Sequence, residues 1–159
     1  MKAAVVRIAT DDDIESIHEI INTYAGDGTL LSRSRDDIAS TIGNFYVAVV
    51  NGDIAGVITF HDYGDHLKEV RSLAVKKKYL RRGIGSMLLG KLIDDLTSAN
   101  SPTLFVLTYA PEFFKKNGFV EINMDTLPEK IWKDCMYCMN YATCSEIALL
   151  YDTNRTTQS

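Results

Sequence analysis

The segment from Glu69 to Leu96 constrains the fold of this chain more than any other. It begins with a largely apolar run that ends at Val75, continues through a basic stretch, and then reaches Gly83 and Gly85. From Ile84, between the two glycines, apolar residues recur at helical spacing and share one helix face, at positions 84, 88, 89, 92, 93 and 96. The segment therefore predicts a buried strand, an exposed basic turn and an amphipathic helix.

The turn between this strand and this helix has the chemistry of a phosphate site. A helix N-terminus exposes unpaired backbone N–H groups and the positive end of the helix dipole, and glycines let a phosphate approach them. The basic run from Lys76 to Arg82 adds mobile positive charge. We expect a pyrophosphate on the amides of Arg82, Gly83, Ile84, Gly85 and Ser86. A glycine turn beside a solvated charge run is the alternative, because this Gly-x-Gly is neither a dinucleotide fingerprint nor a P-loop.

Composition places the chain among ordinary soluble globular proteins. Its 159 residues predict one domain, residues 1–152, followed by a polar tail, residues 153–159. A net charge of −4 argues against general nucleic-acid binding. We expect no membrane span and no signal peptide, because no apolar run is long enough for either. An odd number of cysteines, three, is not a secreted disulfide framework, so a cytoplasmic location is expected.

The rest of the chain alternates strand and helix signals, which predicts an α+β (mixed α/β) fold. The clearest is a hairpin turn at Asn51-Gly52 between two apolar runs. Thr10 followed by three aspartates is a helix start. The predicted strands are 3–9, 45–50, 54–62, 69–75, 103–108, 119–123 and 146–151, and the other predicted helices are 34–42 and 111–116.

Two motifs resemble those of the GNAT acyltransferases. Leu73-Ala74-Val75, Tyr79 and Arg82 to Ser86 look like motif A, and Phe113 to Phe119, FFKKNGF, looks like motif B in the expected order. Three residues before the first glycine, the family usually has an Arg or Gln that contacts phosphate. This chain has Leu80 there, so Arg81 and Arg82 are the candidates for the phosphate contact. The resemblance implies a mostly antiparallel, twisted central sheet of six to seven strands flanked by about four helices. It also implies a candidate homodimer.

The resemblance further implies a reaction and its residues. Acetyl-CoA would lay its pantetheine arm between splayed strands, against the backbone of Leu73, Ala74 and Val75. An amine would then attack the thioester directly, with Glu69 as the candidate general base. The tyrosine that commonly protonates the departing thiolate is Phe114 here, which leaves Tyr109 or water as the acid.

A narrower resemblance concerns the acceptor. LSRS at 31–34, EVRSLAV at 69–75, VLTYAPEFFKKNGF at 106–119 and the late Leu127-Pro128…Trp132 block are similar to short N-acetylglutamate synthase-type amino-acid acetyltransferases. This implies L-glutamate as the acceptor, in arginine biosynthesis, with Arg33 and Arg71 on its carboxylates and Lys130 as a third cation. Two alternatives stay open. One is another amine, such as a polyamine, another amino acid or a protein N-terminus; the other is a non-catalytic acetyl-CoA-binding module.

The late part of the chain contains three cysteines, Cys135, Cys138 and Cys144, whose spacing could serve packing, metal binding or redox chemistry. Packing of small thiols is favoured, because a zinc site needs four ligands and the histidines are distant in sequence. Zinc binding and a Cys-x2-Cys redox pair are the alternatives. We predict no metal site.

Overall fold

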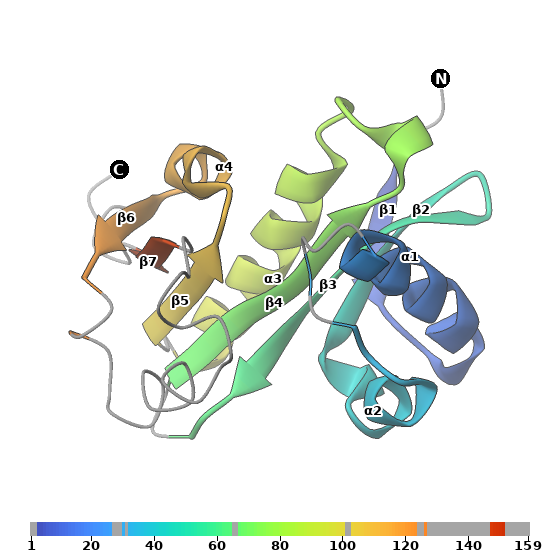
Figure 1. Ribbon diagram of the computed structural model, residues 1–159, viewed down its shortest axis with the longest axis horizontal. Helices are drawn as coiled ribbons and strands as arrows, with labels where there is room; N and C mark the ends of the chain where they lie inside the picture. The colour runs from blue at the N-terminus through green and yellow to red at the C-terminus, as the bar shows by residue number, and fades with distance from the viewer. Residues whose placement is uncertain are drawn as a thin grey trace. The chain divides into compact units, whose positions relative to one another are not determined.

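The computed structural model describes residues 3–26, 30, 32–64, 67–100, 103–123, 126 and 147–151 (Figure 1). The chain divides into two compact units, Met1–Pro102 and Thr103–Ser159, which are described separately.

The first unit holds four strands and three α-helices among its described residues. They are β1 (Val5–Ile8), α1 (Ile14–Gly26), α2 (Arg35–Ser40), β2 (Phe45–Val50), β3 (Asp53–Asp62), β4 (Leu67–Val75) and α3 (Ile84–Asn100). Short 3-10 turns at Asp11–Asp13, Ile42–Asn44 and Lys77–Tyr79 precede α1, β2 and the glycine turn. The second unit contains β5 (Thr103–Thr108), α4 (Pro111–Lys116), β6 (Phe119–Ile122) and β7 (Ile147–Tyr151).

Strands β1 to β4 pair antiparallel in chain order, and helices pack on both faces of the sheet that they form (Figure 1). The β2–β3 hairpin turns at Asn51 and Gly52, both with positive φ, as an Asn-Gly turn requires. Phe45 and Val47 point to one face and join a core with Ile17 and Ile21 of α1. Side chains alternate along a strand, so Tyr46 points to the other face, where its hydroxyl donates to Asp95 of α3 at 2.7 Å.

Helix α3 buries the face that the sequence predicts. Its residues Ile84, Leu88, Leu89, Leu92, Ile93 and Leu96 are all buried. The helix approaches β3 closely at Gly56, where an added Cβ would lie 3.0 Å from the carbonyl oxygen of Ala74 and 3.1 Å from Leu88 Cδ1. This glycine therefore lets the helix and the sheet approach one another.

Gly56→Ala is expected to destabilise the protein by about 1–3 kcal/mol, because the Ala74 carbonyl belongs to the backbone and cannot move aside cheaply. Urea unfolding measures the change. Gly90→Ala is the matched control: a Cβ there meets nothing within 4 Å, and alanine favours a helix, so the free energy of unfolding should stay equal or rise. Equal stability of the two variants would contradict the prediction.

The second unit is a three-stranded antiparallel arrangement with β7 in the middle, paired with β5 and with β6. Helix α4 begins at Pro111, and Asn117 and Gly118 follow it, the latter with φ of 95°. Across both units the described residues hold seven strands and four α-helices, and their pairings given above are antiparallel. The mixed α/β prediction is confirmed, with element ends moved by one or two residues in most cases.

Three smaller points follow from the described residues. The predicted helix 34–42 is shorter, because α2 ends at Ser40 and a 3-10 turn replaces its last residues. None of the described helices is long and apolar enough to cross a membrane. Cys135, Cys138, Cys144 and Lys130 lie outside the described residues, as does the tail.

Candidate active site

The predicted phosphate turn forms the entrance to α3. Gly83 has φ of 77°, in the region that glycine adopts without strain, and α3 begins at the next residue, Ile84. The Gly83 carbonyl accepts a hydrogen bond from the N–H of Met87 at 3.1 Å. Arg81 and Arg82 are exposed beside this turn, and Arg81 itself has φ of 67°. The local geometry thus has the open helix N-terminus and exposed cations that the sequence predicts.

Much of the basic run is anchored rather than mobile, which corrects the expectation from the sequence. The Asp53 carboxylate, at the start of β3, accepts hydrogen bonds from Tyr79 Oη at 2.8 Å and Lys76 Nζ at 3.1 Å, and pairs with Lys78 at 3.4 Å. The hydrogen bond from Tyr79, followed by that from Lys76, lowers the pKa of Asp53 to about 2. Arg82 lies over the Tyr79 ring, with its Cζ 5.5 Å from the centroid. Asp53 therefore ties the phosphate turn to the β2–β3 hairpin.

A second polar network lies on β4, in the same unit. Glu69 is buried, and its Oε1 accepts hydrogen bonds from Arg71 Nε at 2.8 Å and from Tyr63 Oη at 3.0 Å. Arg71 Nη2 also donates to Tyr63 Oη at 2.8 Å, which closes the triangle. Burial and the Glu69 charge raise the pKa of Tyr63 to about 12, so its phenol stays protonated and can donate. Burial opposes the charge of Arg71, but Glu69 outweighs it and raises the pKa of Arg71.

The backbone of β4 departs from regular strand geometry directly after this network. Ser72 has φ of 53°, and β4 carries one residue more than β3 between the pairs Thr59–Arg71 and Val57–Ala74. Glu69 and Arg71 precede this bulge, so the alternation that places them on one face holds.

Leu73, Ala74 and Val75 follow the bulge and lead to the phosphate turn. The hydroxyl of Tyr24 of α1 donates a hydrogen bond to the Val75 carbonyl oxygen at 2.5 Å. A carbonyl oxygen has two lone pairs, so it can accept a second hydrogen bond. The backbone contacts of these three residues with a pantetheine arm stay a prediction.

Arg33 lies in the segment that leads into α2, and its side chain is only 15% exposed. Its Cζ is 5.5 Å from the centroid of Phe45, and Nη1 pairs with the half-exposed Asp37 at 3.2 Å. Burial lowers the pKa of Arg33; Asp37 acts against this effect, and the neighbouring Arg71 cation adds to it. Phe45 and Arg71 both pair in register with Thr59 of β3, so the two arginines lie over the same face of the sheet.

Sequence reasoning missed two residues of this neighbourhood, Tyr63 and His61. His61 pairs in register with Glu69 across β3 and β4, and its ring meets that of Tyr63 edge-on, with centroids 4.5 Å apart. One sequence pattern could have identified them. His61 and Tyr63 are two positions apart before a short turn, and Glu69 and Arg71 are two positions apart after it, the spacing of side chains that share a strand face. The position of Tyr63, after the predicted strand 54–62 and directly before Gly64, favours a turn instead.

The candidate acid, Tyr109, belongs to the second unit, where it follows β5 and is 52% exposed. Phe114 is buried in α4 and packs edge-on against Phe113 and Phe119, with centroids 5.2 and 5.3 Å away. Phe114 therefore packs in an aromatic cluster of that unit, and the role of Tyr109 stays a prediction.

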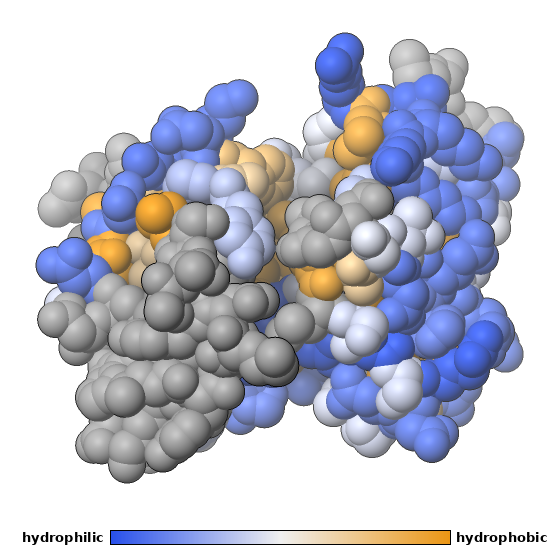
Figure 2. All heavy atoms as spheres, viewed as in Figure 1, coloured by the Kyte–Doolittle hydropathy of each residue, from blue (hydrophilic) through white to orange (hydrophobic). Residues whose placement is uncertain are grey.

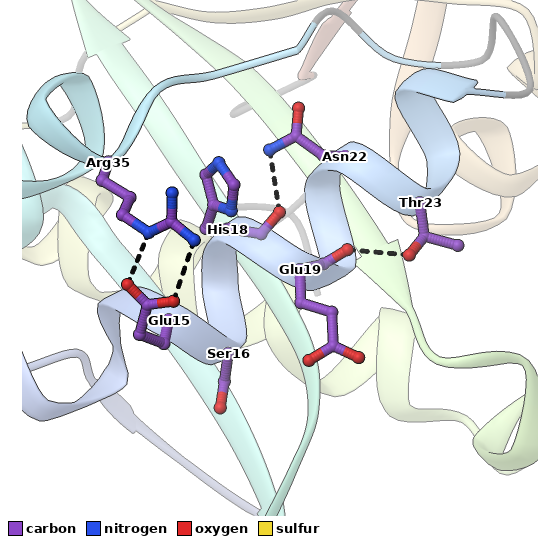
Figure 3. A pocket seen from close by; sticks show the side chains of 7 residues that line it. All are labelled: Glu15, Ser16, His18, Glu19, Asn22, Thr23 and Arg35. Carbon is purple, nitrogen blue, oxygen red and sulfur yellow. Dashed lines mark hydrogen bonds and ion pairs between the residues drawn. The ribbon is translucent and has the colours of Figure 1, made fainter.

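A pocket of about 500 Å³ lies elsewhere in the first unit, along the outer side of α1 (Figure 3). The surface over α1 and α2 is mostly hydrophilic in Figure 2. Arg35 makes a two-pronged ion pair with Glu15 in this pocket, at 2.5 and 3.1 Å. None of the residues predicted to bind substrate lines it. The described residues contain no group of three His, Cys, Asp or Glu side chains arranged to hold a metal ion.

Comparison with known proteins gives consistent matches. A family model described as an acetyltransferase (GNAT) domain matches residues 41–121. An uncharacterized N-acetyltransferase of Chlorobaculum tepidum is 38% identical over 145 residues, which cover 91% of this chain and 94% of the relative. An amino-acid acetyltransferase of Mycobacterium tuberculosis is 29% identical over 140 residues, which cover 86% of this chain and 79% of the relative.

A solved structure matches as well. The N-acetylglutamate synthase of Neisseria gonorrhoeae, in complex with coenzyme A and N-acetyl-glutamate, superposes with a TM-score of 0.84 at 26% identity. The match covers 95% of this chain and 35% of that chain, so this protein corresponds to about a third of the longer synthase. The chain therefore belongs to the GNAT family of acetyltransferases, as its motifs predict, and is an N-acetyltransferase with acetyl-CoA as co-substrate.

Proposed function

We propose that this enzyme transfers the acetyl group of acetyl-CoA to the α-amine of a small acidic amino acid, with L-glutamate as the favoured acceptor. Arg33 and Arg71 bind the acceptor's carboxylates, and the turn from Arg82 to Ser86, with Arg81 beside it, binds the pyrophosphate. Glu69 acts as a general base. The product, N-acetylglutamate, would place the enzyme in arginine biosynthesis.

The convergence of two guanidinium groups is the observation that carries this proposal. Arg33 and Arg71 lie 38 positions apart in the sequence. Arg33 lies over the ring of Phe45, which pairs in register with Thr59 of β3, and Thr59 pairs on its other side with Arg71. Cross-strand partners share a face, so the two guanidinium groups lie over the same face of the sheet. Neighbouring cations favour a ligand with negative charge, and guanidinium groups bind carboxylates with two parallel hydrogen bonds. The gonococcal synthase that matches this chain binds N-acetyl-glutamate, which supports the same acceptor class.

A cationic acceptor fits this neighbourhood less well. Asp62 is paired with Lys68 at 2.8 Å, and Glu69 is paired with Arg71 at 2.8 Å, so both carboxylates already have a cation. Asp65, the acidic residue in the turn between β3 and β4, lies outside the described residues. The ammonium groups of a polyamine would compete with Lys68 and Arg71 for these two carboxylates. A binding module without turnover is the second alternative, and the assay below tests it directly.

Release of free CoA from acetyl-CoA, measured over a panel of amines, tests the proposal. The panel contains L-glutamate, L-glutamine, L-aspartate, L-leucine and spermidine. We expect the highest kcat/KM with L-glutamate. Turnover only with spermidine would overturn the acidic acceptor, and tight acetyl-CoA binding without turnover of any amine would favour the binding module.

Arg33→Gln is expected to raise KM for L-glutamate about 10- to 100-fold, the loss that follows from removing one charged hydrogen-bonding partner. KM for acetyl-CoA should change little. Arg35→Gln is the matched control, because Arg35 is exposed and pairs with Glu15 in the pocket of Figure 3. An equal rise of KM for L-glutamate in both variants would contradict a role of Arg33 in acceptor binding.

A further inference from the structure

His61 is an imidazole at the edge of the Glu69 network that the mechanism so far leaves unused. It lies on β3 directly opposite Glu69, edge-on to the Tyr63 ring. Its side chain is exposed, and within the described part of the chain no hydrogen bond to its ring nitrogens is found. Glu69, Arg71 and Tyr63 are, by contrast, bonded to one another.

The face of the sheet on which His61 lies is the one expected to receive the acceptor. Thr59 and His61 are two positions apart on β3 and oppose Arg71 and Glu69 of β4. Cross-strand partners share a face, so the imidazole stands on the same side as the Glu69–Arg71 pair. Arg71, the cation of that pair, therefore lies on the same side of the sheet as the imidazole.

Acetylation of an amino acid requires two protons to leave the nitrogen. The α-ammonium gives up one before it can attack, and the second leaves when the C–N bond has formed. Glu69 is poorly suited to accept both protons. Its Oε1 already accepts two hydrogen bonds, which leaves Oε2 as the oxygen that can take a proton. A second proton acceptor nearby would take one of the two protons.

We propose that His61 accepts the proton that the acceptor's ammonium group releases before attack, an inference that rests on the proposed function. The imidazole nitrogen takes this proton, and the amine lone pair then forms the C–N bond with the thioester carbonyl carbon. The C–S bond breaks with its electron pair on sulfur, and Glu69 takes the second proton of the nitrogen. Solvent protonates the CoA thiolate, and His61 and Glu69 return their protons to solvent, so one proton is released in each turnover.

The charges that face His61 favour its neutral, proton-accepting form. Partial burial against its neighbours lowers the pKa of His61, and the Arg71 cation of β4 lowers it further. Arg33, from the segment before α2, acts in the same direction, whereas Glu69 and Asp62 act against it; Tyr63 packs on the ring. Because the pKa falls below the ordinary value of about 6.5, the imidazole is neutral at pH 7.

His61→Gln and His61→Ala test this role. With the amine that the wild type turns over best, kcat should fall about 100-fold in both variants, while KM for acetyl-CoA stays within about twofold. Added imidazole should restore part of kcat in His61→Ala only. Wild-type kcat should be level above pH 6.5 and fall below it, whereas kcat of His61→Gln should rise across the neutral range as solvent removes the proton. His18→Gln, a histidine in the pocket on α1, should match the wild type throughout.

The outcomes separate this inference from the proposed acceptor. If L-glutamate is not turned over but another amine is, the glutamate proposal fails and His61 is tested with that amine. Unchanged kcat and an unchanged pH profile in His61→Gln would overturn the role of His61. A loss of kcat that imidazole does not restore and that leaves the shape of the pH profile intact would overturn it too, because it would indicate a structural effect. An enzyme that acetylates no amine would overturn both proposals.

Discussion

Arg71→Met is expected to lower kcat/KM for the acceptor by about 100- to 1,000-fold, because it removes a carboxylate partner and releases the two side chains that Arg71 holds. Glu69 Oε1 loses the cationic donor Arg71, and Tyr63 loses the Arg71 hydrogen bond. Steady-state CoA release with L-glutamate measures the effect. A variant that keeps kcat/KM within threefold of the wild type would contradict the role of Arg71.

The same substitution should also cost stability. Glu69 is buried, and breaking a buried ion pair leaves an uncompensated charge; the Arg71 side chain is 35% exposed, so we expect about 1–3 kcal/mol rather than the full penalty. The double variant Arg71→Met/Glu69→Gln removes that charge and should regain most of the lost stability without regaining activity. Recovery of activity in the double variant would contradict a direct role of either side chain. Arg71→Lys should retain stability better than Arg71→Met, because it keeps the positive charge.

The local patterns of this sequence predicted the fold well where one physical rule dominates. The helix from Ile84 repeats its apolar residues at helical spacing, and every one of the six is buried. The Asn51-Gly52 turn is specified by two positive φ angles that these residue types tolerate best. Alternation along a strand places Glu69 and Arg71 on one face, where they bond to one another, since the bulge at Ser72 comes only after them.

Contacts between distant positions were not predictable in the same way. Asp53 forms hydrogen bonds and ion pairs with Lys76, Lys78 and Tyr79, which lie more than 20 positions away in the sequence. No local sequence pattern predicts these contacts. The basic run was therefore interpreted as free charge. Tyr63 follows β3 directly beside a glycine, which favours a turn, and only the pairing of β3 with β4 brings its hydroxyl to Glu69. The register of that pairing also places His61 directly opposite Glu69.

Gly83→Val is expected to raise KM for acetyl-CoA about 30- to 100-fold. Gly83 has φ of 77°, a conformation that a β-branched residue strongly disfavours, so the turn must change shape to accept valine. A Cβ at this position meets nothing within 4 Å, so protein crowding plays no part. The expected loss comes from the displaced amides at the start of α3, each of which is worth a charged hydrogen bond to a pyrophosphate. Initial rates at varied acetyl-CoA, with saturating acceptor, measure it.

Gly64→Val separates this effect from backbone strain alone. Gly64 has φ of 80° and also meets nothing within 4 Å, so valine should cost a similar amount of stability there. It lies in the turn after β3, away in sequence from the phosphate turn, and KM for acetyl-CoA should stay near the wild-type value. If both variants raise KM for acetyl-CoA equally, the effect comes from general destabilisation. If only Gly83→Val does so, the amides from Arg82 to Ser86 bind the cofactor, and Arg81 and Arg82 become the next positions to replace, because the family's usual Arg or Gln is Leu80 in this chain.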